Sequence, residues 1–151
     1  MTLSLLALSV AALATAVWVG SIVFQSAIVA PSVFTALESS DASRFLRRLF
    51  PSFFRLGIVC GAIMTLGFGY LTVGSAYDAW LLALSGAMTV LAIVSLVLVP
   101  RINAARDAGE AGAASFEKLH RLSVLLTVLI LLAGIVVLVH IARLGVAGLQ
   151  A

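Results

Sequence analysis

Charged residues are scarce in this sequence. Asp, Glu, Lys and Arg make up 10% of the 151 residues, and none of them precedes Glu38, whereas soluble domains average about 25%. Hydrophobic residues make up 63% of the chain, compared with about 45–50% in soluble domains. Too few polar side chains remain to cover a surface that faces water. The composition excludes a soluble globular protein and predicts one integral membrane domain over residues 1–151.

Cysteine and histidine are also rare, which limits metal and redox chemistry. The single cysteine, Cys60, lies in an apolar run and lacks the paired spacing of a metal site, so we interpret it as a small packing residue. His120 and His140 lie on one predicted helix, about 30 Å apart along its axis, and cannot share a metal or haem. We predict no cofactor and no metal site, and His120 is the one residue left as a candidate ligand.

Ionisable side chains are missing from the middle of every long apolar run. Such residues normally mark proton relays and ion paths in membranes, so a proton-coupled pump is not expected. Metal, redox and phosphate-binding motifs are absent as well, and nothing in the sequence argues for an enzyme. The basic residues flank apolar runs instead of forming a stripe, which argues against a nucleic-acid partner.

Four apolar runs are long enough to cross a membrane. About 20 apolar residues span a hydrocarbon core of about 30 Å, and the runs lie at about 3–33, 53–74, 79–99 and 119–141. We expect the first run to be retained, because the N-terminus lacks the positive charge of a signal peptide. Pro31 is expected to end or bend this long run, and Ser75–Asp78 to form a tight hairpin.

Lys and Arg are concentrated on one side of the predicted spans, and only Arg143 lies on the other. The positive-inside rule therefore places loops 34–52 and 100–118 in the cytoplasm and both termini outside. We predict a multi-pass protein of the cytoplasmic (inner) membrane. The basic residues in these loops and at their margins are Arg44, Arg47, Arg48, Arg55, Arg101, Arg106, Lys118 and Arg121.

The first loop has amphipathic character, because its apolar residues recur at helical spacing: Phe45, Leu46, Leu49, Phe50, Phe53 and Phe54. We expect a short interfacial helix there, broken or started by Pro51. Its basic side chains, Arg44, Arg47, Arg48 and Arg55, are expected to hold it on anionic lipid. Binding of a partner or ligand is the alternative. The second basic loop is expected to be helical in parts, with a flexible middle around Gly109 and Gly112.

Small and polar residues recur along one face of each run, and in lipid such faces let helices approach. In the first run they are Ser4, Ala7, Ala11, Ala14, Trp18, Ser21, Gln25, Ile28 and Ser32. In the later runs they are Gly57, Cys60, Met64, Gly67, Leu71 and Gly74; Ala79, Ala83 and Gly86; and His120, Ser123, Thr127, Ile130, Gly134 and Val137. We predict an all-α integral membrane protein: an up-down four-helix bundle with the interfacial helix in its first loop.

Polar residues of the first and fourth spans should meet at one level on the cytoplasmic side. Gln25 lies about 9 Å inward of Pro31, and Ser123 and Thr127 lie about 5–10 Å inward of His120. We predict a polar pocket there, and its candidate ligand-binding residues are Trp18, Gln25, Ser32, Arg101, Asn103, His120, Ser123 and Thr127. The alternative is that Gln25, Ser123 and Thr127 bond only to one another or to nearby backbone.

Five stretches occur in a recognisable order: W-V-G-S-I-V-F from Trp18, A-P-S-V-F from Ala30, L-F-P-S-F-F from Leu49, P-R-I-N from Pro100 and F-E-K-L-H-R-L-S from Phe116. Together they resemble the transmembrane-protein-205-like domain family, which implies a four-span membrane protein of unassigned function. The resemblance singles out Trp18, Gly20, Pro31, Phe34, Pro51, Pro100, His120 and Ser123. Thr127 stands where that family is expected to have Asn.

The W-x-G pattern at Trp18 is also distantly similar to copper-resistance D-type and haem-binding protoporphyrinogen-oxidase-type membrane proteins. Those families imply a His in the first span upstream of the Trp. This chain has no His there, which counts against haem or copper.

Three functions remain open. The favoured one is a non-enzymatic bundle that binds or moves a small hydrophobic or amphipathic molecule through the cytoplasmic-side pocket. The second is an accessory subunit of a larger membrane complex, and the third is a haem- or metal-dependent oxidoreductase that uses His120. The lipid bilayer is the expected partner in each case, and a homo-oligomer is left open.

Overall fold

The computed structural model describes residues 2–73 and 79–149, with the backbone alone for 144–149. The elements are α1 (Leu3–Phe24), the π-helical turn η1 (Gln25–Val29), α2 (Ala30–Ala36), α3 (Ser39–Val73), α4 (Ala79–Asp107), the 3-10 turn η2 (Gly109–Gly112) and α5 (Ala113–Leu149). Four helical stretches are long and apolar enough to cross a membrane: Leu3–Ala36, Ser39–Val73, Ala79–Asp107 and Gly109–Arg143. The predicted all-α four-helix bundle is confirmed. The hairpin predicted at Ser75–Asp78 lies outside the described residues.

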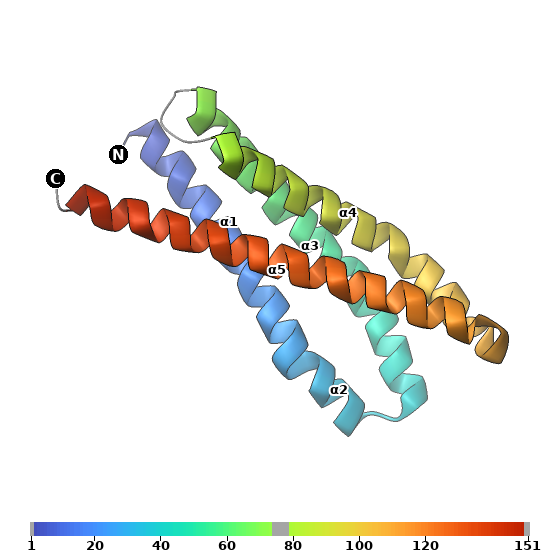
Figure 1. Ribbon diagram of the computed structural model, residues 1–151. Coiled ribbons are helices and arrows are strands. Elements are labelled where there is room, and N and C mark those ends of the chain that lie inside the picture. Colours follow the sequence, from blue (N-terminus) through green and yellow to red (C-terminus); the bar gives the residue numbers. More distant parts are fainter. Residues whose placement is uncertain (1, 74–78, 150–151) are drawn as a thin grey trace.

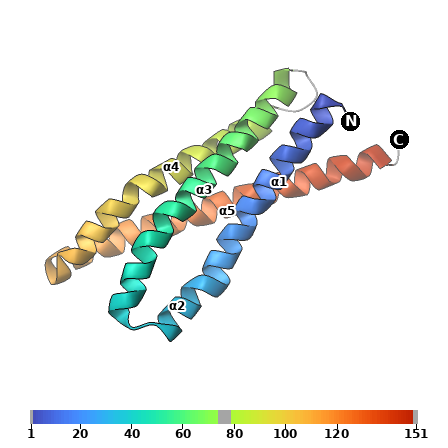
Figure 2. The same ribbon diagram turned by 180° about the vertical axis from the view of Figure 1, so that it is seen from behind.

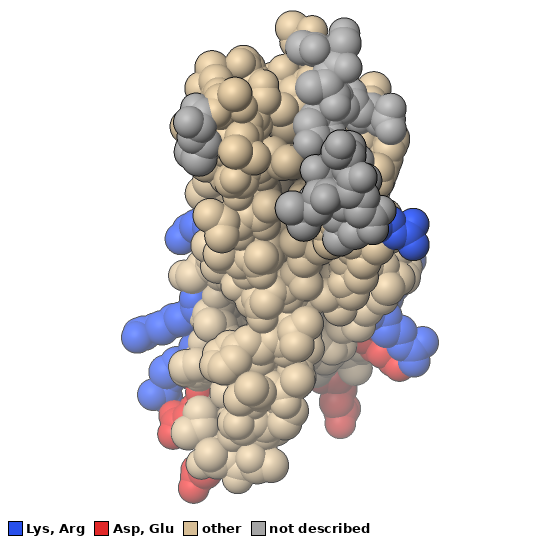
Figure 3. All heavy atoms as spheres, turned by 90° about the vertical axis from the view of Figure 1, so that its left-hand side faces the viewer, with Lys and Arg blue, Asp and Glu red and all other residues tan. Residues whose placement is uncertain are grey.

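The helices pack in a layered order, with α3 between α1 and α4, and α5 against α4 and across α1 (Figures 1 and 2). The start of α1 and the end of α5 lie at one end of the bundle. At the opposite end, the α2–α3 connection and the α4–η2–α5 turn diverge. The helix ends beside these connections carry most of the Lys and Arg, so we call this the basic end: Arg44, Arg47 and Arg48 on α3, Arg101 and Arg106 on α4, and Lys118 and Arg121 on α5. Much of the face in Figure 3 carries no charged group, and its acidic groups lie in the lower part.

Trp18 of α1 lies in the core and packs against Gly57 of α3. A Cβ at Gly57 would lie 2.2 Å from Cζ2 of Trp18, so a larger residue would collide with the indole. The indole also meets the Phe53 ring, with the ring centroids 4.8 Å apart. One turn further on, a Cβ at Gly61 would lie 2.4 Å from Oγ1 of Thr89 on α4. The two glycines thus bring α3 close to α1 and α4 in turn.

The inward face predicted for the first span is correct in part: Ser4 is exposed, and Ala7 and Ser21 are half-buried. Ala11, Ala14, Trp18 and Gln25 are all buried, whereas the next two predicted positions, Ile28 and Ser32, are exposed. The residues that turn inward instead each come one position later. Val33 is buried, and Val29 packs against the cluster that Val33 forms with Ala42 and Leu46.

This shift of one residue has its origin in η1. The N–H of Ala30 donates to the carbonyl oxygen of Gln25, five residues back, so the turn holds more residues than an α-helical turn. One extra residue rotates every later side chain by about 100° relative to the seam. Pro31 follows directly, and it lacks the N–H that a regular α-helix would use there. The distortion predicted near Pro31 is therefore present, but the helix continues to Ala36.

The helix expected in the first loop is present as the beginning of α3 and is not a separate element. α3 starts at Ser39 and passes through Pro51 without a break, which corrects the expected boundary at that proline. The reason is tertiary packing: Ala42 and Leu46 lie buried against Val33 of α2, and this contact holds the first turns in line with the rest of α3.

The inward face predicted for the third span is wrong. Ala79 and Ala83 are exposed, and the buried face of α4 comprises Leu81, Ser85, Met88, Ala92, Ser95, Leu98 and Val99. The hydroxyls of Ser85 and Ser95 donate to the carbonyl oxygens of Leu82 (3.0 Å) and Leu91 (2.8 Å). These serines satisfy their polar groups within α4, so larger apolar neighbours can share the buried face with them.

The turn between α4 and α5 is compact where flexibility was expected. Gly109 has a φ of 58°, a conformation that side-chain-bearing residues rarely adopt. A Cβ at Gly112 would lie 1.9 Å from the carbonyl oxygen of Ala105. The two glycines therefore permit a tight reversal that sets α5 directly against α4.

Candidate functional site: a cavity at the basic end

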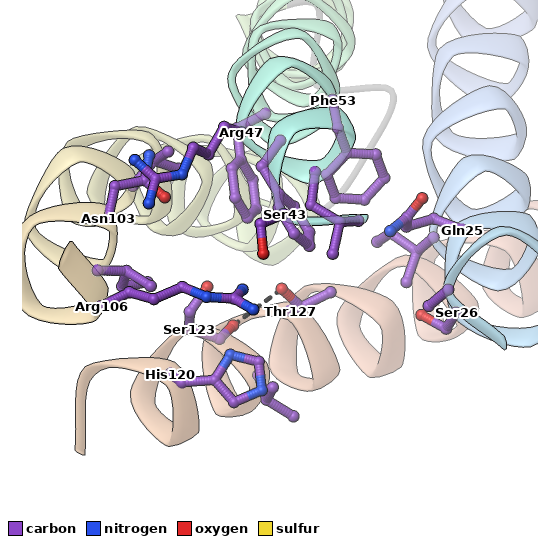
Figure 4. Close-up of a pocket in the computed structure, with 18 of the residues that line it drawn as sticks. Gln25, Ser26, Ser43, Arg47, Phe53, Asn103, Arg106, His120, Ser123 and Thr127 are labelled. Carbon is purple, nitrogen blue, oxygen red and sulfur yellow. Dashed lines mark hydrogen bonds between the residues drawn. The ribbon is translucent and has the colours of Figure 1, made fainter. Parts of the chain in front are cut away.

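A cavity of about 720 Å³ lies among the helices at the basic end. Small-molecule pockets occupy about 300–1,000 Å³, so its size is that of a binding site for one ligand. All four spans contribute a wall, as Figure 4 shows with α1 and η1 facing α3, α4 and α5. The polar residues that line it are Gln25, Ser26, Ser43, Arg47, Asn103, Arg106, His120, Ser123 and Thr127.

The cavity exists because two helices cross closely and then separate. At the crossing, a Cβ at Gly134 of α5 would lie 2.4 Å from Cγ2 of Val19 on α1. From there towards the basic end the helices diverge (Figures 1 and 2), and neither η1 nor α2 packs against α5 in the described part of the chain. Ser26 and Phe34 on one side and Val124 and Val128 on the other line the cavity and are exposed, so the cavity is open between these helices.

Five of the eight predicted ligand-binding residues line this cavity: Gln25, Asn103, His120, Ser123 and Thr127. The other three do not. Trp18 is 1% exposed and lies behind Phe53, which is itself part of the lining. Ser32 and Arg101 are exposed and lie outside the lining. The structure thus brings together the polar residues of the first and fourth spans, with Asn103 from the third.

The polar groups of these two spans face one another across open space. Thr127 Oγ1 donates to the backbone oxygen of Ser123 at 2.9 Å, within its own helix (Figure 4). Gln25 lies on the opposite wall, and within the described residues its side chain has no hydrogen bond to Ser123 or Thr127. Gln25 is only 7% exposed, so its amide is nearly removed from solvent and directed at the cavity.

The α3 wall was not foreseen from the sequence. It includes Ser43, Leu46, Arg47, Phe50 and Phe54, at spacings of three or four residues. The same spacing continues to Gly57, on the face that the sequence analysis had already identified as inward. Because Pro51 was expected to break or start a helix, the sequence did not indicate that this face continues to the residues before it. Arg47, which was assigned to the lipid interface, is therefore part of this wall, whereas Arg44, Arg48 and Arg55 are exposed.

The cavity wall is electrically positive. Arg47 and Arg106 line it, and no Asp or Glu belongs to the lining. Arg47 donates two hydrogen bonds to the Asp107 carboxylate, one of them Nη1 to Oδ2 at 2.9 Å. This ion pair, at the polar end of α4, partly neutralises Arg47.

Arg106 is placed differently. Its guanidinium lies over the Phe116 ring, 5.8 Å from the centroid, and no ion pair to it occurs among the described residues. The His120 ring stacks parallel to the same Phe116, with centroids 5.7 Å apart. Phe116 thus holds both side chains at the mouth of the cavity, where Figure 4 shows Arg106 directed inward.

The described residues hold no group of three or more His, Cys, Asp or Glu placed to bind a metal ion. Comparison with known families gives one match: residues 13–111 match the family described as a domain of unknown function (DUF4149). The chain belongs to the DUF4149 family. The DUF4149 match includes the cavity walls on α1, α3 and α4, and the α5 wall lies beyond it. Neither the curated proteins nor the solved structures gave a match.

Proposed function

We propose that this protein binds or moves a small amphipathic molecule of the membrane through the cavity at the basic end, without carrying out a reaction on it. The observation that carries this proposal is the cavity itself, whose largely apolar lining includes Arg106 and His120 towards the basic end and Gln25 further in. Ile22, Phe54 and Leu131 line its deep part, and Arg106 and His120 line its mouth. A site of this kind suits a molecule with one polar and one apolar end.

The open side of the cavity supports access from the bilayer. Because η1 and α2 do not pack against α5 in the described structure, a molecule in the surrounding lipid can reach the cavity sideways. The positive-inside rule assigns the basic end to the cytoplasmic side of the inner membrane. The proposed ligand would then come from the cytoplasmic leaflet. The finer resemblance to the transmembrane-protein-205-like family remains a prediction and adds no substrate.

The test is to fill the cavity and compare ligand-induced stabilisation. Ser123→Phe would place a ring into the cavity, whereas Ser32→Phe makes the same change at an exposed position outside it. Wild-type protein in lipid nanodiscs would be screened with single-chain amphiphiles and apolar compounds by thermal unfolding. A ligand at about 100 times its Kd stabilises by about 2.7 kcal/mol, which raises Tm by several degrees.

We expect this rise in wild type and in Ser32→Phe, and its loss in Ser123→Phe. The proposal is wrong if no compound raises the Tm of the wild type, or if Ser123→Phe responds as fully as Ser32→Phe does.

A further inference from the structure

We propose that the ligand of this cavity is a single-chain amphiphile with an anionic headgroup, and that Arg106 binds the headgroup. This inference rests on the proposed function and specifies the chemistry of its ligand. Three observations carry it: the charge of the lining, the direction in which its polarity changes, and the volume of the space.

The charge of the lining selects for an anion. The wall contains two arginines and no carboxylate, so it disfavours a cationic ligand. Of the two arginines, Arg47 already donates both hydrogen bonds of its fork to Asp107. Arg106 has no ion pair in the described part of the chain and is held in place by Phe116. A guanidinium binds carboxylates and phosphates through two parallel hydrogen bonds, and Arg106 is positioned to offer them.

The polarity of the lining changes in the same direction on α4 and α5, whereas on the first span the polar Gln25 and Ser26 lie further in than Phe34. On α4 the lining runs from Arg106 inward to Val99, about 10 Å at 1.5 Å per residue. On α5 it runs from His120 inward to Leu131, about 16 Å. In both helices the inner end is apolar. A bound amphiphile would therefore keep its headgroup at the membrane interface and its chain in the hydrocarbon, as in the leaflet that it comes from.

The volume of the cavity suits one chain. At roughly 30 Å³ for each water-sized group, 720 Å³ holds about two dozen non-hydrogen atoms. A long-chain fatty acid or alkyl phosphate is of this size, whereas the second chain of a phospholipid would have to remain outside. The shared chemistry is one anionic group on one alkyl chain.

Trp18 provides a reporter for this test. It lies behind Phe53, a residue of the lining, and is shielded from the bilayer. Trp80, the only other tryptophan in the sequence, lies at the start of α4, at the opposite end of the bundle. In a Trp80→Phe variant, a brominated chain quenches Trp18 fluorescence only if it enters the cavity. A Trp18→Phe variant, in which Trp80 is 38% exposed, measures quenching by chains that are merely dissolved in the bilayer.

The probes are dibromostearate, dibromostearyl alcohol and dibromostearyl amine, added at mildly alkaline pH to protein in phosphatidylcholine nanodiscs. We expect dibromostearate to quench Trp18 at a concentration at least about tenfold lower than the alcohol, and the amine to be weakest. Arg106→Gln in the Trp80→Phe background should remove most of this difference while quenching by the alcohol is kept. Asp107→Asn should increase the difference between dibromostearate and the alcohol, because Arg47 then loses its ion pair and can also bind the headgroup.

Competition identifies the source of the anion. Unbrominated palmitate and hexadecyl phosphate should displace the probe, and inorganic phosphate should not. Displacement by inorganic phosphate at the concentration of hexadecyl phosphate would overturn the requirement for a chain. Equal quenching by the acid and the alcohol would overturn the anionic headgroup and leave the proposed function standing. If no chain quenches Trp18 while all quench Trp80, both proposals fail.

Discussion

At the scale of single residues, helix packing depends on glycines as much as on the large side chains that contact them. Gly57 lets the Trp18 indole lie against the α3 backbone, and Gly134 lets Val19 do the same against α5. In lipid the association of helices depends on such close packing, because lipid tails are as apolar as the helices themselves. The first contact builds the floor behind the cavity, and the second sets the crossing from which the cavity opens.

Gly57→Ala is therefore expected to destabilise the bundle. The new methyl would have to displace a ring that is 1% exposed, and such overpacking costs about 1–3 kcal/mol. The free energy of unfolding in mixed micelles measures the effect. Gly20→Ala is the matched control, because a Cβ there meets nothing within 4 Å and alanine favours the helix by up to about 1 kcal/mol. Adding Trp18→Phe to Gly57→Ala should recover part of the loss, and equal destabilisation by both glycine variants would contradict this account.

A substitution at Gln25 distinguishes a role in ligand binding from a role in helix packing. The buried amide of Gln25 has no hydrogen bond to Ser123 or Thr127 in the described structure, so Gln25→Leu should not destabilise the ligand-free protein. A hydrogen bond between helices would instead be lost at a cost of about 0.6–1.7 kcal/mol. The same unfolding measurement decides between them, and a loss above 1 kcal/mol would favour packing. Thr127→Val provides the comparison for an intrahelical hydroxyl.

At the scale of elements, η1 is the unusual feature of the first span. Single π-turns often occur at functional sites, and this one begins at Gln25, a residue of the cavity lining. The sequence predicted a disturbance near Pro31 because proline leaves a gap in the hydrogen-bond ladder. It could not predict that the helix would absorb the disturbance by adding a residue upstream. For that reason Gln25 faces inward as expected, whereas Val33 takes the inward position that was expected of Ser32.

Deletion of Ile28 tests this account of η1. Ile28 is exposed within the π-turn, so removing it should convert the turn to α-helix and keep Val33 facing Ala42 and Leu46. The variant should run as a single species on size exclusion, with Tm within a few degrees of wild type. Deletion of Val17, which is equally exposed but lies in α1, should rotate Trp18 away from Gly57 by about 100°. That variant should aggregate. If both deletions have the same effect, the π-turn does not contain an extra residue and this account is wrong.

At the scale of the whole molecule, composition and hydropathy were sufficient for the class and the number of spans, and helical rise was sufficient to place Gln25 at the level of Ser123 and Thr127. These follow from lengths and levels along the helices, which a sequence records directly. The α3 wall could not be predicted from the sequence, because Pro51 resembled a helix boundary. The burial of Leu46 against Val33 shows that the inward face continues to residues before Pro51. The opening beside α5 depends on a crossing at Gly134, and a crossing point is a property of two packed helices.

Orientation in the membrane is the remaining property of the whole molecule, and it decides which leaflet the cavity faces. The positive-inside rule predicts that the basic end is cytoplasmic. In a Cys60→Ala background, a membrane-impermeant maleimide applied to intact cells should label Thr2→Cys at the start of α1. It should label Glu38→Cys, in the connection between α2 and α3, only after the membrane is opened. The reverse pattern would turn the cavity to the outer leaflet, and the proposed ligand would then have to come from there.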